Sequence, residues 1–401
     1  MDFYGYMRPN GKAGARNYVL LLPVNRSLNF IASNVERMTR NTRHFEIPAE
    51  TGRTEVDREV IARTLIGLMN NANVGGIVLL AVKSGAGSAY KNMCAERFEE
   101  EARKTGKPFR IVYLTNVGGS YNMLGETLRL TREVLLEVSD FRRENCPLSA
   151  LTLGVKCGTS DATSGIAGNP CVGAAFDQLI RAGGTAFFSE TTEIIGAEDL
   201  VAKRAVNESV AKKILSAAKH WEDKAKATSE DIRKINPIPA NIAAGISTLE
   251  EKSLGAIAKS GTSPIQDVLK YAEMPKGSGL YFVDSWMSSL SLPLCLTACG
   301  ATIMLYQMGG GKIAQHPMMP SINPTVVSPF LYLTGNAIAY SRAPDNFDFD
   351  ASPIMTEGAS IPEMGTKLLE HLSAIASGTM TKMETLNYAE QLELYMEGPV
   401  L

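Results

Sequence analysis

This chain of 401 residues contains few histidines and cysteines, and it has no excess of basic residues. Its four histidines leave little room for a site built on a histidine cluster. The six cysteines include no C-x-x-C pair and are too dilute for a disulfide scaffold, so we expect reduced thiols. Forty Lys and Arg residues against 42 Asp and Glu residues give a net charge of −2, which provides no basic field for a nucleic-acid backbone. We therefore expect no nucleic-acid partner.

Long apolar runs are also missing. No run approaches the roughly 20 residues that span a bilayer, and the first residues lack the apolar core of a signal peptide. We therefore expect a cytoplasmic protein with no membrane partner. At roughly 150 residues per domain, the length suits two or three domains.

Short β-branched or Leu-rich runs alternate with longer amphipathic segments, which is typical of βα units around a mainly parallel sheet. We expect strands at residues 18–24, 76–82, 109–114, 150–155 and 185–190. We expect helices at residues 28–40, 55–70, 90–105, 123–139, 172–182 and 207–226. The sequence thus predicts an α/β fold of two α/β domains with mainly parallel sheets, in which the N-terminal half is Rossmann-like. We place the domains at residues 1–145 and 146–401, with a charged and then Pro-rich linker at residues 222–241.

The polar loop KCGTSDATSGIAGNP follows the strand expected at residues 150–155 and leads into a helix. In an open α/β sheet, ligands bind beyond the carboxyl ends of the strands, where a helix N-terminus favours anions. The loop offers a cation, a thiol, hydroxyls and a carboxylate: Lys156, Cys157, Thr159, Ser160, Asp161 and Ser164. A connector whose Ser and Asp residues only cap the next helix is the alternative, but a cap needs one such residue.

Glu190 ends the next expected strand, and Glu193 and Glu198 follow it closely. Neighbouring loops would place Asp161 and Glu190 on opposite sides of one small ligand. Carboxylates so placed, with Cys157 beside them, can bind a divalent metal such as iron or divide acid and base roles. Glu193 and Glu198 have a structural alternative, because acidic residues also favour a helix N-terminus.

Two lysines mark a third candidate segment, NPIPANIAAGISTLEEKSLGAIAKSGTSP. A capping box starting at Ser247 explains the glutamates there but not Lys252 and Lys259. We expect Lys252 to be catalytic. A substrate carboxylate would be bound by residues from this segment, from the loop after residue 155 and from the N-terminus: Arg16, Lys156, Thr159, Ser160, Asn241, Lys259, Thr262 and Ser263.

Two weaker signals lie elsewhere. The turn at Pro9-Asn10-Gly11 would project Arg8, Lys12 and Arg16 as a cationic hairpin. The run GGGKIAQHPMMPSINP contains His316 but lacks the spacing of a phosphate-binding loop.

Together these motifs resemble the altronate/galactarate dehydratase family. GYMRPNGKAGARN, NANVGG, GVKCGTSDATSGIAGNP, SETTEIIGAED and the lysine-bearing segment match the family's motifs in order over nearly the whole chain. The resemblance implies a metal-assisted lyase that removes an α-proton and a β-leaving group from a hydroxy carboxylate such as a sugar acid. It also implies a small SAF domain, which we expect on a separate small subunit because this chain begins at the first motif. We further expect a homo-oligomer.

The sequence departs from the family where Cys or His residues are usual. It has residues 23–27 (PVNRS), 49–54 (AETGRT) and 81–86 (AVKSGA) at these places, with Arg26, Arg53 and Lys83 nearby. Loss of metal-type ligands favours an easier leaving group than hydroxide, so elimination of sulfite, as in the related sulfolactate sulfo-lyase large subunit, is one alternative. A degenerate chain that only binds a hydroxy acid or scaffolds a partner is another. A dinucleotide-dependent oxidoreductase is disfavoured because no GxGxxG follows the first strand.

Overall fold

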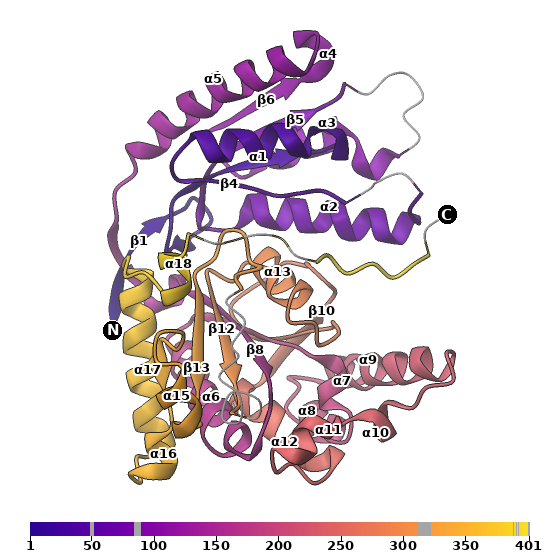
Figure 1. Ribbon diagram of the computed structural model, residues 1–401, viewed down its shortest axis with the longest axis vertical. Coiled ribbons are helices and arrows are strands. Elements are labelled where there is room, and N and C mark those ends of the chain that lie inside the picture. Colours follow the sequence, from indigo (N-terminus) through magenta and orange to yellow (C-terminus); the bar gives the residue numbers. More distant parts are fainter. Residues whose placement is uncertain are drawn as a thin grey trace.

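Two parallel sheets form the body of the protein (Figure 1). The computed structural model describes residues 1–48, 52–83, 90–310, 322–387, 389, 391 and 393–399. Most of the GGGKIAQHPMMPSINP run, including His316, and the residues directly after Lys83 lie outside these ranges. No helix in the described ranges is both long and apolar enough to cross a membrane.

The N-terminal sheet has four parallel strands in the order β4, β3, β5, β6. Their bounds are Thr42–His44 for β4, Tyr18–Pro23 for β3, Val74–Ala81 for β5 and Phe109–Tyr113 for β6. The helices of this part are α1 (Asn29–Met38), α2 (Glu55–Asn70), α3 (Ala95–Lys104), α4 (Leu114–Val117) and α5 (Ser120–Ser139). Alternate residues of β3 and β5 point to opposite faces, so one face packs on α1 and α5 and the other on α2 and α3. This is the three-layer α/β arrangement that the sequence predicts.

The C-terminal sheet has seven parallel strands in the order β10, β11, β9, β8, β12, β13, β14. Their bounds are Ile265–Leu269, Gly279–Val283, Thr185–Phe188, Thr152–Gly158, Ile303–Met308, Phe330–Thr334 and Phe349–Asp350 in that order. One face packs on α6 (Asn169–Arg181), α9 (Glu208–Lys226) and α17 (Ile361–Ala376). The other face packs on α13 (Ser291–Ala298). The fold class expected from the sequence is confirmed.

Shorter elements complete this part of the chain. They are α7 (Thr191–Ile194), α8 (Glu198–Ala202), α10 (Ile232–Ile235), α11 (Pro239–Ala243), α12 (Leu249–Ile257), α15 (Ala337–Arg342), α16 (Pro353–Thr356) and α18 (Lys382–Thr385). The segment expected as an extended linker, residues 222–241, therefore contains the end of α9, all of α10 and the start of α11.

A small antiparallel sheet was not predicted. It pairs β1 (Asp2–Met7) with β2 (Ala13–Gly14) and with β7 (Glu144–Pro147). The first pairing is the hairpin expected around the Pro-Asn-Gly turn. The second joins segments 139 to 145 residues apart in the sequence, which no local pattern reveals.

The two large sheets share one hydrophobic core, because α2 packs directly on α13 between them (Figure 1). The contact is backbone against backbone: a Cβ atom at Gly67 would lie 2.2 Å from the Ala298 carbonyl oxygen. Only glycine fits at this crossing.

Candidate functional site

The sheet topology creates a switch point at β8. From β8 the chain passes through α6 to β9 on one side, and β12 on the other side is reached only later, through α13. Because α6 and α13 cover opposite faces, a crevice opens beyond the carboxyl ends of β8 and its neighbours. Lys156 and Cys157 lie near the end of β8, Glu190 follows β9, and Tyr306 lies near the end of β12.

Glu190 is the centre of a buried ionic cluster. Its Oε1 lies 2.5 Å from Lys156 Nζ, and its Oε2 contacts Lys259 Nζ and accepts a hydrogen bond from the Cys157 N–H at 3.1 Å. Lys259 Nζ also lies 3.0 Å from Cys157 Sγ. The backbone of Glu190 is left-handed, with φ 77°, a conformation that costs energy in a residue with a Cβ atom. The surrounding contacts hold this carboxylate in a strained position, as is common at functional sites.

The cluster continues through Glu193, which lies on α7 after β9, to Lys252 on α12. Lys252 Nζ lies 3.2 Å from Glu193 Oε1 and donates to Asn236 Oδ1 at 2.6 Å and to Asn241 Oδ1 at 3.1 Å. Cys157 Sγ lies 3.5 Å from Glu193 Oε2, which links the two halves. Both Lys252 and Glu193 are buried.

The cluster carries a net positive charge, since three ammonium groups face two carboxylates. Burial opposes the charge on Lys156 and on Lys259. Glu190 outweighs burial at Lys156, and Cys157 with Glu190 outweighs burial at Lys259, so the pKa of both lysines is raised. Burial also opposes ionisation of Glu193, yet Lys252 and the other lysines lower its pKa to about 2. Burial and the Glu190 carboxylate raise the pKa of the Cys157 thiol to about 12. At neutral pH the cluster therefore has one uncompensated positive charge, which favours an anionic ligand.

A cavity of about 320 Å³ opens onto this cluster. Its polar walls include Lys156, Glu193, Asn241, Lys252, Ser289 and Tyr306. Thr159 and Ser160 also line it, as expected from the sequence. A larger groove of about 1080 Å³ runs along α9 and β10, but it lies outside the cluster and its Lys213 is paired with Asp267 at 2.6 Å. We take the smaller cavity as the candidate active site because the unpaired charge is there.

Cys157, Glu190 and Glu193 have the spacing of a metal site, since their ligand atoms lie within 4.8 Å of one another. Their surroundings do not suit a divalent cation. Lysine ammonium groups contact both Glu190 oxygens and Glu193 Oε1. A cation placed among these atoms would compete with three ammonium groups for the same carboxylate oxygens. As arranged, the donor set does not fit the metal.

Asp161, predicted as a catalytic residue and metal ligand, points elsewhere. Its Oδ1 accepts from the Ser164 N–H at 3.0 Å, and its Oδ2 accepts from the Gly310 N–H at 2.7 Å and from Asn336 Nδ2 at 2.9 Å. These bonds fasten the loop after β8 to the end of β12 and to α15. The residue lines a separate neighbouring cavity of about 260 Å³. Asp161 does not point into the candidate active site as expected, because backbone N–H groups near the turn donate hydrogen bonds to its carboxylate.

Thr262 and Ser263 are likewise not brought to the cavity. Thr262 Oγ1 donates to Asp177 Oδ2 at 2.8 Å, and Ser263 Oγ donates to Asp177 Oδ1 at 2.6 Å. Their backbone N–H groups bind the same carboxylate. This segment therefore uses its hydroxyls to hold α6.

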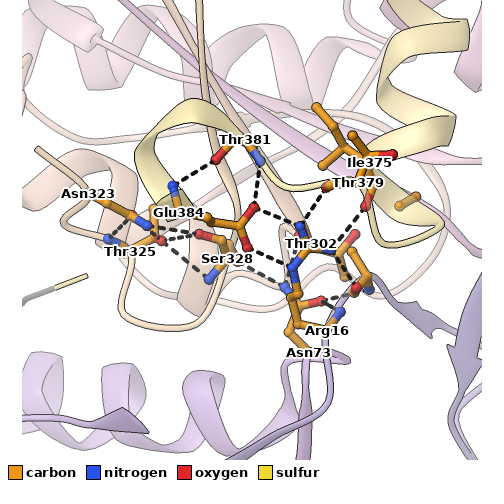
Figure 2. Close-up of polar contacts among 12 residues, drawn as sticks. Arg16, Asn73, Thr302, Asn323, Thr325, Ser328, Ile375, Thr379, Thr381 and Glu384 are labelled. Atoms are coloured by element: carbon orange, nitrogen blue, oxygen red, sulfur yellow. Dashed lines mark hydrogen bonds and ion pairs between the residues drawn. The ribbon is translucent and has the colours of Figure 1, made fainter. Parts of the chain in front are cut away.

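Arg16 lies at the junction of the sheets with α17 and α18, as Figure 2 shows. Its Nε and Nη2 atoms bind the two Glu384 oxygens at 2.6 and 2.7 Å, and its guanidinium also donates to the carbonyls of Ile375 and Thr379. Asn73 continues this network to Thr302 in the C-terminal part. The residue predicted to bind substrate is placed here as a structural bridge.

We expect Arg16→Met to lower the free energy of unfolding by about 3 kcal/mol, because Glu384 would lose its bidentate partner in a largely buried setting. The kcat/KM value of the folded variant should stay within about twofold of wild type. Urea unfolding and steady-state kinetics check this. Unchanged stability with a large rise in KM would instead place Arg16 at the substrate.

The pKa of Glu193 makes a prediction for acid stability. Because its pKa falls from 4.5 unfolded to about 2 folded, Glu193 contributes its full stabilisation above pH 4.5 and loses it as the pH falls toward 2. The gap in free energy of unfolding between wild type and Glu193→Gln should therefore narrow between pH 5 and pH 2. Urea titrations at both ends of this range measure it. A gap independent of pH would contradict the prediction.

Sequence reasoning overlooked Tyr306 and Ser289. Tyr306 lies on the mostly apolar strand IMLYQM, and its only signal in the sequence was its place just before a glycine run. Ser289 belongs to a loop with no recognisable motif. Both reach the cavity through long-range packing.

Comparisons with known proteins match the whole length of the chain. The family model described as D-galactarate dehydratase/Altronate hydrolase, second domain, matches residues 5–139. The model described as D-galactarate/Altronate dehydratase, C-terminal, matches residues 148–399.

Curated relatives carry related names. The chain is 32% identical to (2R)-sulfolactate sulfo-lyase subunit beta of Chromohalobacter salexigens, over 97% of this chain and 96% of that protein. It is 30% identical to altronate dehydratase of Bacillus subtilis, over 100% of this chain and 78% of that protein. It is 29% identical to galactarate dehydratase (L-threo-forming) of Escherichia coli, over 99% and 77%.

Proposed function

Since this chain belongs to the D-galactarate/altronate dehydratase family and is a lyase, we propose that it catalyses β-elimination from a small hydroxy carboxylate. We propose a sugar acid as the substrate and this chain as the large catalytic subunit. The main support for the proposal is the cavity, whose walls contain the cations Lys156 and Lys252 together with the carboxylate Glu193.

The chemistry of elimination explains the excess positive charge. Removing a proton α to a carboxylate spreads a second negative charge onto that carboxylate, which is costly in a poorly hydrated pocket. Fixed ammonium groups that are already in place offset this charge without reorganisation. In the proposal, Lys252 binds the substrate carboxylate, with Asn241 beside it, and Lys156 and Lys259 supply the remaining field.

Glu193 is the proposed base. It is the one carboxylate among the described residues lining the cavity, whereas both oxygens of Glu190 hold lysines. The ion pair with Lys252 keeps the pKa of Glu193 low. A substrate carboxylate that also binds Lys252 would weaken this ion pair, so substrate binding would raise the pKa of Glu193 and make it a better base. Glu190 and Cys157 then act as positioning residues for the lysines.

The reaction balances without a further reagent. The Cα–H bond breaks, its electron pair forms a Cα=Cβ double bond, and the bond from Cβ to the leaving group breaks with its electrons. With a hydroxyl on Cα, the resulting enol becomes a 2-oxo acid. No step uses a metal, since the lysines contact the carboxylates that would bind it.

Elimination of sulfite is the second candidate. The chain aligns with 96% of the sulfo-lyase subunit, against 78% of the B. subtilis altronate dehydratase. The positive cavity also suits a doubly anionic substrate. Since that relative is named a subunit, we propose that this chain, too, works with a small SAF-domain subunit and forms a homo-oligomer.

A substrate screen tests the proposal. The chain, alone and with a candidate small subunit, is incubated with 2,3-dihydroxy acids and sulfolactate, while released sulfite and new 2-oxo acid are measured and the metal content is determined. We expect 2-oxo acid from at least one hydroxy acid, formed about 10²–10³-fold more slowly by Lys252→Met. Formation of 2-oxo acid together with sulfite would select the second candidate, and no product from any acid would contradict the proposal.

A further inference from the structure

Two hydroxyl groups form one wall of the candidate active site, and neither has a role in the proton removal proposed for Glu193 and the lysines. The Tyr306 hydroxyl and Ser289 Oγ are hydrogen-bonded at 2.8 Å, and both residues line the cavity with Lys156. Tyr306 comes from β12 and Ser289 from the loop before α13.

The Tyr306 hydroxyl is held rigidly. Its ring packs on Phe330 and Tyr332, with ring centroids 5.8 and 5.3 Å away. In the sheet it stands directly opposite Lys156 of β8, whose Nζ lies 5.6 Å from the ring centre. The side chains of Tyr306 and Lys156 therefore lie next to each other on the same face of two neighbouring strands.

The backbone leaves room for this hydroxyl. A Cβ atom at Gly158 would lie 2.5 Å from the Tyr306 oxygen, so any larger residue would displace it. Glycine at the end of β8 thus allows the phenol to reach the cavity next to Lys156.

One proton of the hydroxyl pair remains to be donated. Two hydroxyls carry two protons, and their mutual hydrogen bond uses one. Neither oxygen has another hydrogen-bond partner within the described ranges. Burial raises the pKa of Tyr306, although Lys156 opposes this, so the phenol is protonated at neutral pH.

We propose that Tyr306, hydrogen-bonded to Ser289, is the general acid that protonates the leaving hydroxyl. This inference rests on the proposed β-elimination. As the Cβ–O bond breaks, its electron pair stays on oxygen, which takes the Tyr306 proton and leaves as water. The tyrosinate is stabilised by Lys156 and regains a proton from solvent through Ser289. Hydroxide is a poor leaving group, so this proton is essential to the reaction.

Leaving-group dependence tests the role. Tyr306→Phe keeps the ring and its packing but has no proton to donate. With a β-hydroxy substrate, we expect kcat to fall by about 10²–10³-fold with little change in KM. With the analogue carrying chlorine at the same carbon, which leaves without protonation, the loss should be at least about tenfold smaller. Tyr332→Phe is the matched control, because its hydroxyl binds the Ile322 carbonyl outside the cavity, and its kcat should be unchanged.

The outcomes separate this inference from the proposed function. Equal losses for both substrates, or no loss for the hydroxyl substrate, would overturn the role of Tyr306 while elimination by the wild type still supported the function. Turnover of only a sulfite-releasing substrate would also overturn it. A wild-type chain that eliminates from no substrate would overturn both.

Discussion

Glu190→Gln is expected to lower the free energy of unfolding by about 3–5 kcal/mol and to remove most activity. The substitution keeps the shape of the side chain but leaves Lys156 and Lys259 buried with no carboxylate between them. Uncompensated buried charge is among the most destabilising single changes. Urea unfolding at pH 7 and kcat/KM measure the two effects.

The neighbouring Glu198 provides the control. It belongs to the same sequence motif but forms a surface ion pair with Arg233 at 2.7 Å. Glu198→Gln should change the free energy of unfolding by less than about 1 kcal/mol and leave kcat/KM unchanged. If Glu190→Gln changed the free energy of unfolding and kcat/KM as little as Glu198→Gln, the buried cluster would be needed neither for stability nor for activity.

Lys252→Met should lower kcat/KM by about 10²–10³-fold, the scale of removing one preorganised charge stabiliser. From the sequence alone, such a change should hardly affect folding. The structure corrects this, because Lys252 is buried and its loss leaves the Glu193 carboxylate without its nearest partner. We therefore expect a lower free energy of unfolding as well.

A double variant separates the two effects. Adding Glu193→Gln to Lys252→Met removes the uncompensated charge, so stability should recover in part while activity should not. Lys107→Met is the matched control: Lys107 is also buried, but it donates to the carbonyls of Met69 and Asn71, away from the cavity. That variant should lose stability at unchanged kcat/KM. Normal kinetics for Lys252→Met with a large loss of stability would show that the lysine is only structural.

Local patterns were sufficient for most of the fold. The helix expected at residues 55–70 is α2, with a Thr54 cap, and the strands expected at residues 18–24 and 109–114 are β3 and β6. Each has strong periodicity and clear end signals. The pairing of β1 with β7 was not predictable, because it depends on contacts between distant segments with weak patterns of their own.

For the candidate site, sequence reasoning selected polar residues but not their partners. The structure brings together Lys156, Cys157, Glu190, Lys252 and Lys259. Arg16 and Asp161 are charged like the residues of the cluster, but they bind other groups of the protein and so hold the fold together. A single sequence does not distinguish a charged residue that binds a ligand from one that stabilises the fold. Tyr306 was missed for a different reason, since most of its neighbours in the sequence are apolar and nothing marks it as part of a polar motif.

Loss of the substrate's α-hydrogen shows whether Glu193 removes a proton during elimination. A hydroxy acid found to be a substrate is labelled with deuterium at the α-carbon, and release of the label into water is followed with wild type and with Glu193→Gln. We expect release in step with 2-oxo acid formation by the wild type, and none by the folded Glu193→Gln variant. Product formed by the wild type without release of the label, or undiminished release by the variant, would contradict it.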